Sequence, residues 1–225
     1  MTNIIIAIDG PAGAGKSTIS KLVATKLGIN YIDTGAMYRA LTLKCIENNI
    51  DTENETDVVA MSNQSDINFE NNTIYLDGKD VSALIRSQII NKNVSNVAKI
   101  KDVRLKMVEI QRMLGSDKDV ILDGRDVGTH IFPNTKFKFF LNASPEERGK
   151  RRYEEMVSKG ENVVLEDIIE DVKRRDSIDS KREFAPLIKA DDAIEIDSTN
   201  MSIQEVVDCI VSIVNKNRQV YDEII

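Results

Sequence analysis

The sequence is poor in the residue types that mark disulfide-rich and metal-binding proteins. Its 225 residues include no tryptophan, two cysteines and one histidine. Cys45 and Cys209 occur in apolar, helix-like segments and not at metal-ligand spacing, so no disulfide framework is expected. The one histidine, His130, is interpreted as structural or incidental. A reducing cytosol is therefore the expected compartment.

Positive charge in bulk and long apolar runs are also absent. The net charge is −7 at pH 7, which argues against a protein that coats nucleic acid, so any bound anion must meet a local cluster of cations. The first apolar run, Ile4–Ile8, is too short for a signal peptide, and no segment has the length of a transmembrane helix. We therefore expect a cytoplasmic protein without membrane or nucleic-acid partners.

What the sequence does contain is an alternation of short apolar strands with helices. Ile4–Ile8 is a β-branched run typical of a strand buried on both faces, and a helix is predicted from about Ser17 to Leu27. A further helix is predicted over Met37–Asn48, and further strands over Tyr31–Ile32, Val120–Leu122, Phe137–Leu141 and Ala193–Ile196. This alternation indicates an α/β fold with a central parallel sheet.

Two regions interrupt the alternation. Residues 66–81 have strand-like spacing with turn signals at Asn71-Asn72 and Asp77-Gly78, which predicts an antiparallel meander of about three strands inserted into the core. Residues 144–186 are highly charged and are predicted to be helical, beginning with a capping box at Ser144. Ser202 begins the final helix in the same way.

The strongest motif is a phosphate-binding loop. Residues 10–17, Gly-Pro-Ala-Gly-Ala-Gly-Lys-Ser, match G-x-x-x-x-G-K-[ST] at every fixed position, with an apolar strand before and a helix after. Glycines let backbone N–H groups converge on phosphate oxygens, and the helix N-terminus adds its positive dipole end. Lys16 would reach the β- and γ-phosphates, and the Ser17 hydroxyl would ligate Mg²⁺. The alternative, a glycine-rich turn that only joins strand to helix, fits less well, so the motif predicts binding of ATP and Mg²⁺.

Several classes of protein share this loop, and cations elsewhere in the chain distinguish among them. A guanine-specific switch should carry Asn-Lys-x-Asp, but residues 91–94 are Asn-Lys-Asn-Val. A small-molecule kinase needs cations around a second phosphate site, and six of the twelve arginines fall between Arg148 and Arg182. Two sets share helix faces by their spacing: Arg148, Arg151 and Arg152, and Arg175, Asp179 and Arg182. The alternative is a solvated helix laced with Glu–Arg pairs.

Two short polar elements follow predicted parallel strands, where α/β proteins place their sites. One runs from Asp33 to Arg39 and the other from Asp123 to Asp126. Each alone could be a turn with a helix cap, but with the phosphate-binding loop they bring Arg39 and Arg125 to a shared crevice. Asp123 would organise the water shell of Mg²⁺.

These elements, in this order, closely resemble those of the bacterial cytidylate kinases. The matching pieces are residues 10–18, 33–39 (Asp-Thr-Gly-Ala-Met-Tyr-Arg), 123–129 (Asp-Gly-Arg-Asp-Val-Gly-Thr), 175–176 with 182–187, and 197–199. The resemblance implies a single P-loop kinase domain over residues 1–225, with a five-stranded parallel sheet flanked by helices, a small three-stranded antiparallel insert and a mobile helical lid. Its core would span about 1–36, 116–144 and 185–225, its monophosphate-binding region with the insert about 37–115, and its lid about 145–184.

The resemblance also implies roles for individual residues. ATP would be bound by Gly10, Pro11, Ala12, Gly13, Ala14, Gly15, Lys16, Ser17 and Thr18. Ribose and α-phosphate would be held by Thr34, Tyr38, Arg39, Arg125 and Arg175, while Ser95, Arg104, Asp126 and Arg182 would face the cytosine and Asp179 the sugar. The catalytic residues would be Lys16, Asp123, Arg125, Arg148 and Arg152, with Mg²⁺ on Ser17 and, through water, on Asp123.

The expected reaction is transfer of the γ-phosphoryl group of ATP to CMP or dCMP by a monomeric enzyme. A carboxylate such as Asp126 can accept from the exocyclic amine of cytosine and would repel the carbonyl of uracil. No general base is required because the acceptor phosphate is already anionic at neutral pH. Two alternatives stay open: a kinase with another small acceptor, and a nucleotide-driven switch with a protein partner.

Overall fold

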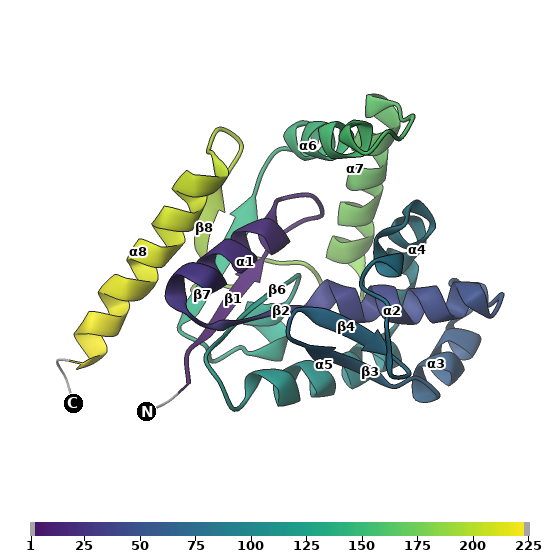
Figure 1. Ribbon diagram of the computed structural model, residues 1–225, viewed down its shortest axis with the longest axis horizontal. Helices are drawn as coiled ribbons and strands as arrows, with labels where there is room; N and C mark the ends of the chain where they lie inside the picture. Colours follow the sequence, from purple (N-terminus) through teal and green to yellow (C-terminus); the bar gives the residue numbers. More distant parts are fainter. Residues whose placement is uncertain (1–2, 223–225) are drawn as a thin grey trace.

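The computed structural model describes residues 3–222 and confirms the expected five-stranded parallel sheet. The strands lie in the order β2-β6-β1-β7-β8 (Figure 1). Their bounds are β1 Ile5–Asp9, β2 Asn30–Asp33, β6 Val120–Gly124, β7 Phe137–Asn142 and β8 Ile194–Asp197. β1 is therefore the central strand, with β6 on one side and β7 on the other, and the loop that follows it starts from the middle of the sheet.

Helices cover both faces of this sheet, and side chains alternate between two cores along each strand. Ile6 and Ile8 of β1 pack with α1 (Lys16–Leu27) and α8 (Ile203–Asp222). Ala7 points to the other face, where it belongs to a core with α2 (Thr34–Glu47), α4 (Gln88–Ala98) and α5 (Lys101–Gly115). Within residues 3–222, no helix is both long enough and apolar enough to cross a membrane.

The region between α2 and α4 carries the predicted antiparallel insert. Its strands are β3 Ile67–Glu70, β4 Thr73–Leu76 and β5 Lys79–Asp80, preceded by α3 (Glu55–Asn63) and followed by the short helix η1 (Leu84–Arg86). The turns lie where the sequence predicts them, since Asn71, Asn72, Asp77 and Gly78 all have positive φ. An ion pair of 2.7 Å between Lys44 and Asp77 ties the insert to α2.

Helices α6 (Pro145–Ser158) and α7 (Leu165–Lys181) pack against each other, and Figure 1 shows them crossing at a large angle. The Ser144 hydroxyl accepts from Glu147 N at 3.2 Å, as the capping box predicts. The expected helical region extends too far, because Arg182 leaves the helix in an extended conformation and Ala185 has φ 50°. The predicted start of α2 at Met37 is also wrong: Asp33 caps the helix by accepting from Ala36 N, so it begins at Thr34.

Candidate active site

A cavity of about 980 Å³ lies at the carboxyl ends of β1, β2 and β6, lined by residues of α6 and α7 and by residues of α2 and α4. Most predicted site residues line it: Ala12, Gly13, Ala14, Gly15, Lys16, Ser17, Thr18, Thr34, Tyr38, Arg39, Ser95, Arg104, Asp123, Arg125, Asp126, Arg152, Arg175, Asp179 and Arg182. Gly10, Pro11 and Arg148 do not line it. The fold thus brings residues from seven separate segments around one space.

The loop after β1 forms one end of the cavity. Gly10 has φ 149°, and a Cβ there would lie 2.0 Å from Leu141 O, so only glycine fits. Lys16 is buried and its Nζ lies 2.7 Å from both Gly10 O and Pro11 O. Burial, followed by the nearby Arg125 charge, lowers the pKa of Lys16. The lysine therefore folds back on its own loop and would have to turn outward to meet a phosphate.

Ser17 and Asp123 make a hydroxyl–carboxylate pair beside this loop. Ser17 Oγ donates to Asp123 Oδ2 at 2.8 Å, and Tyr31 OH donates to Asp123 Oδ1 at 2.8 Å. Burial and the neighbouring Asp33 raise the pKa of Asp123. Mg²⁺ in nucleotide sites takes few protein oxygens and completes its shell with water and phosphate, so this donor set fits it. Tyr31 was not predicted, because its hydroxyl meets Asp123 only once β2 and β6 pair.

Two arginines that line the cavity, Arg39 and Arg175, have buried donor nitrogens with too few acceptors. Arg39 Nε and Nη1 and Arg175 Nε are buried and have no hydrogen-bond partner among residues 3–222. Burial and then the charges of Arg125, Arg39 and Arg152 lower the pKa of Arg175 to about 9. Burial likewise lowers the pKa of Arg39. Buried donors and an excess of like charge describe a site built for an anion with several oxygens.

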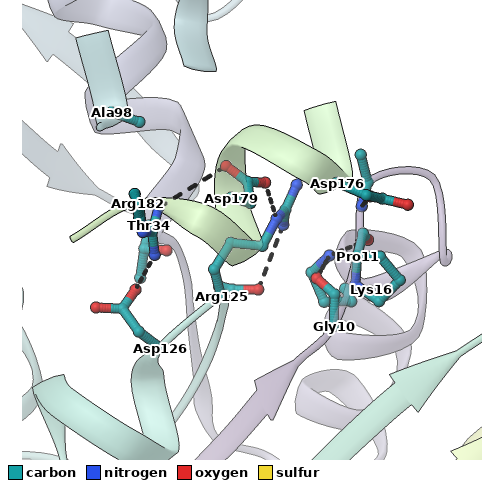
Figure 2. Close-up of polar contacts among 12 residues, drawn as sticks. Gly10, Pro11, Lys16, Thr34, Ala98, Arg125, Asp126, Asp176, Asp179 and Arg182 are labelled. Carbon is teal, nitrogen blue, oxygen red and sulfur yellow. Dashed lines mark hydrogen bonds and ion pairs between the residues drawn. The ribbon is translucent and has the colours of Figure 1, made fainter. Parts of the chain in front are cut away.

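Asp179 organises the arginines on the opposite side. Arg125 Nε donates to Asp179 Oδ2 at 2.8 Å, and Arg182 Nη1 lies 3.8 Å from Asp179 Oδ1 (Figure 2). Thr34 Oγ1 donates to the carbonyl of Asp123 at 2.7 Å, which fixes it against the end of β6.

The far end of the cavity contains a buried ion-pair cluster. Arg104 is 1% exposed, and its Nη2 lies 2.5 Å from Asp126 Oδ2 while its Nη1 donates to Ala98 O. Its guanidinium also lies over the Tyr38 ring at 5.3 Å. Arg182 Nη2 approaches the other oxygen of Asp126 at 3.4 Å (Figure 2). This end therefore presents a carboxylate and two planar cations, with Ser95 nearby in the lining, to an occupant with both donors and acceptors.

Arg148 has a different environment from the other predicted arginines. It is 3% exposed and donates to Ala143 O, Ala12 O and Asp176 Oδ2 at 2.8, 2.7 and 2.6 Å. Asp176 in turn accepts from Ala12 N at 3.2 Å. The pair thus holds the loop between β1 and α1 through its backbone, from two helices that are more than a hundred residues away in the sequence.

Two parts of the lining were not predicted. Arg86, from the end of the insert, places Nη2 2.5 Å from Asp33 Oδ2. Residues 198–203 border the phosphate-binding loop, and Arg151 Nη2 donates to Ser198 O at 2.7 Å. In the sequence, Arg86 is a single arginine after the predicted meander, and nothing in its spacing marks it as a site residue. Residues 197–199 are among the pieces that match the cytidylate kinases, but no role in the site was predicted for them.

Asp9, the last residue of β1, is a buried carboxylate outside the cavity lining. Its two oxygens accept from Val127 N at 2.8 Å and Gly128 N at 2.7 Å. Burial outweighs these two hydrogen bonds and raises the pKa of Asp9 to about 6.

This raised pKa predicts a specific pH dependence of stability. Between about pH 4 and pH 6 the folded protein holds a proton on Asp9 that the unfolded chain releases, so the free energy of unfolding falls as pH rises and is level above pH 6.5. The free energy of unfolding of the wild type, less that of Asp9→Asn, should therefore fall by about 3 kcal/mol between these pH values. Urea unfolding of both proteins at a series of pH values measures this difference. A difference independent of pH would contradict the assignment.

Comparison with known proteins agrees with this geometry. A protein-family model described as cytidylate kinase matches residues 6–216. A protein of Clostridioides difficile (strain 630) named cytidylate kinase is 59% identical over 215 residues, covering 96% of this chain and 100% of the relative. One of Alkaliphilus oremlandii (strain OhILAs) with the same name is 54% identical, covering 95% of this chain and 98% of the relative.

Solved structures share the fold at low sequence identity. A gluconokinase from Sinorhizobium meliloti 1021 has a TM-score of 0.51 at 12% identity, covering 98% of this chain and 97% of that one. An uncharacterized protein from Eubacterium ventriosum ATCC 27560 has a TM-score of 0.52 at 14% identity, covering 96% and 99%. At these identities the likeness concerns the fold alone.

Proposed function

Because this chain belongs to the cytidylate kinase family, we infer that it is a nucleoside monophosphate kinase that transfers the γ-phosphoryl group of ATP to CMP, giving ADP and CDP. The observation that carries this inference is the placement of a phosphate-binding loop and a buried Arg104–Asp126 pair at opposite ends of one cavity. Arginines with unpartnered donors lie between them, where two anionic substrates would meet.

The finer parts of the function are proposals of the same kind. dCMP is accepted as well as CMP, the enzyme works as a monomer in the cytoplasm, and Mg²⁺ accompanies ATP. Residues 37–115 act as the monophosphate-binding region, residues 145–184 as a lid, and about 1–36, 116–144 and 185–225 as the core, whose first two and last three residues lie outside the described chain.

ATP lies along the loop from Gly10 to Thr18, with its phosphates on the backbone amides and its base toward residues 198–203. Lys16 turns from Gly10 O and Pro11 O to the β- and γ-phosphates. Ser17 and, through water, Asp123 would hold Mg²⁺, whose charge would offset that of the phosphates. Arg148 acts indirectly, because its donors are occupied by the loop backbone and Asp176, while Arg152 lines the cavity and faces the transferred group.

CMP occupies the other end. Its phosphate lies among the cations Arg39, Arg125 and Arg175, with Thr34 and Tyr38 beside phosphate and ribose. Its ribose contacts Asp179, and its base is held by Ser95, Arg104, Asp126 and Arg182. Asp126 accepts from the exocyclic amine of cytosine, and the arginines donate to its O2 and N3.

The chemistry requires positioning and charge neutralisation more than proton transfer. The attacking oxygen belongs to a phosphate that is already anionic at pH 7, so no side chain has to act as a general base. Buried arginines aimed at the phosphate stabilise the charge of the transferring group. His130 takes no part, since its ring packs edge-on against Phe184 at 4.7 Å and it is absent from the cavity lining.

The experiment that tests the function is an ADP-release assay with ATP and Mg²⁺ against CMP, dCMP, UMP, AMP, GMP and no acceptor. Fast turnover largely confined to CMP and dCMP is the expected result. Equal rates with CMP and UMP would be consistent with a nucleoside monophosphate kinase but would overturn the account of base selection. Slow ADP release independent of acceptor would favour a nucleotide-driven switch.

Arg182→Ala is expected to damage the use of CMP and to spare ATP. The substitution removes one of two cations on Asp126, while Arg104 keeps that carboxylate paired. We expect the KM for CMP to rise about tenfold or more, as loss of one charged hydrogen bond implies, with the KM for ATP within twofold. The neighbouring, exposed Lys181→Ala is the matched control. An equal rise in both KM values would contradict this role.

Closure of the lid is expected on both nucleotides, because water in the site would hydrolyse ATP. The lid already touches the monophosphate-binding region, with Gln88 Nε2 donating to Glu161 Oε2 at 2.5 Å and Arg174 Nη2 to Lys92 O at 3.2 Å. The turn around Ser158–Gly160 gives it a flexible point. We expect amide hydrogens of α6 and α7 to exchange about tenfold more slowly with both nucleotides bound. Unchanged exchange would contradict closure.

A further inference from the structure

The turn that follows β6 carries Asp126 and has an unusual backbone. Residues Val127–Ile131 form one π-helical turn, in which His130 N and Ile131 N both donate to Asp126 O, at 2.8 and 3.1 Å. The first amides of such a turn have no acceptor within it and need one from elsewhere.

Asp9 supplies those acceptors. Its Oδ1 takes Val127 N and its Oδ2 takes Gly128 N, so one carboxylate holds the two amides that come directly after Asp126. The Asp9 backbone is itself fixed in the centre of the sheet, paired with Gly124 of β6 and Phe140 of β7. Asp9 is 5% exposed and does not line the cavity, so its action on a substrate must be indirect.

The other end of the turn is held from α5. Arg112 Nε donates to Ile131 O at 2.9 Å and its Nη2 to His130 O at 2.8 Å. The space is also tight, because a Cβ on Gly128 would lie 3.2 Å from the Lys138 side chain and 3.4 Å from Asp9 Oδ2. The turn therefore has little freedom to shift while Asp9 and Arg112 are in place.

The position of the Asp126 carboxylate depends on this restraint. Arg104 and Arg182 contact its two oxygens unequally, at 2.5 and 3.4 Å, and a fixed backbone at Asp126 limits how far that carboxylate can shift toward either cation. A hydrogen bond between the amine of a base and this carboxylate would be weakened by a displacement of a fraction of an ångström.

We propose that Asp9 is a positioning residue for base selection: by holding the amides of Val127 and Gly128, it fixes Asp126 in the orientation that prefers cytosine to uracil. The proposal rests on the proposed function. It gives β1, the strand that leads into the phosphate-binding loop, a role in the recognition of CMP.

The test begins with Asp9→Asn, which keeps the shape but turns one acceptor into an NH₂ group facing an amide. We expect the KM for CMP to rise about tenfold and the ratio of kcat/KM for CMP to that for UMP to fall about tenfold. The KM for ATP should stay within twofold. Removing a buried charge offsets the lost hydrogen bond, so the variant is expected to fold at pH 7.5. Asp102→Asn, an exposed carboxylate on α5, is the control.

A double-substitution cycle separates positioning from a general loss of structure. If Asp9 acts through Asp126, adding Asp9→Asn to Asp126→Asn should change the CMP-to-UMP ratio by less than twofold beyond Asp126→Asn alone. Arg112→Met, at the exposed end of the turn, should lower the ratio in the same way and provides the test if Asp9→Asn does not fold.

Three results would overturn the proposal. They are an unchanged CMP-to-UMP ratio in both Asp9→Asn and Arg112→Met, a further drop of the ratio in the Asp126→Asn background, and a rise in the KM for ATP with the ratio kept. The last would assign Asp9 to the phosphate-binding loop, which it directly precedes. A wild-type enzyme without preference for CMP over UMP would instead overturn the account of base selection in the proposed function, so the two failures are distinguishable.

Discussion

Replacing Lys16 with alanine is expected to lower kcat about 10³-fold. Lys16 is the one charged residue of the loop sequence from Gly10 to Thr18. The attraction between its ammonium group and the β- and γ-phosphates would become stronger as negative charge moves toward the leaving oxygen. Its present partners are two carbonyls of the same loop, Gly10 O and Pro11 O, both at 2.7 Å. Because these hydrogen bonds can be exchanged for phosphate contacts without moving the backbone, the loss should appear mainly in the chemical step.

Single-turnover phosphoryl transfer at saturating CMP measures this effect, with thermal unfolding to establish that the fold is kept. Lys26→Ala is the matched control, because Lys26 lies on the same helix and pairs with the exposed Asp208 at 2.6 Å. Near-normal turnover by Lys16→Ala would show that the loop from Gly10 to Thr18 does not hold the transferred phosphate.

Replacing Arg175 with methionine is expected to make the protein more stable and nearly unable to use CMP. Arg175 is buried, its Nε has no hydrogen-bond partner, and burial together with Arg125, Arg39 and Arg152 lowers its pKa to about 9. A buried guanidinium among other cations destabilises the folded protein when no anion is bound beside it. Methionine keeps the apolar stem without the charge, so the free energy of unfolding should rise by about 2 kcal/mol.

The same substitution removes a cation from the expected phosphate position, so the KM for CMP should rise about 100-fold. Urea unfolding and initial rates on one preparation measure both effects. Lys173→Met is the control, because Lys173 lies on the same helix and makes an exposed pair with Glu146 at 3.2 Å. A loss of stability in Arg175→Met would mean that the cation has a partner within the fold, and this arginine cluster would then be structural.

CMP should also affect the two proteins differently. In the wild type, binding relieves repulsion among the arginines and should raise the Tm by the amount that its affinity dictates. In Arg175→Met this increase should be largely lost at the same concentration.

Local patterns in the sequence were sufficient for the sheet, the insert and the phosphate-binding loop. Ile4–Ile8 and residues 10–17 carry their information within a few neighbours, because apolar runs and glycine spacing determine the backbone locally. The resemblance added residues such as Ser95 and Arg104, which are ordinary polar positions on helices without it. The structure brings both to the cavity, while their contacts with a base stay a prediction.

The remaining features depend on contacts between distant segments. Arg148 was predicted from helical spacing to face a substrate, yet its donors meet the loop of Ala12 and the carboxylate of Asp176. Asp9 is an ordinary strand terminus until the turn after β6 folds against it. Helical periodicity predicts which face a side chain is on and not what approaches that face, so these partners could not have been read from spacing.

The central place of β1 has a consequence for the order in which the chain can acquire function during synthesis. β1 ends at Asp9, but its two neighbours in the sheet are β6 and β7, which end at Gly124 and Asn142. The residues of β1 must therefore wait unpaired while more than a hundred others leave the ribosome, and closing so long a loop is slow. A nascent chain shorter than about 142 residues should be unable to retain ATP, although its entire phosphate-binding motif has already been translated.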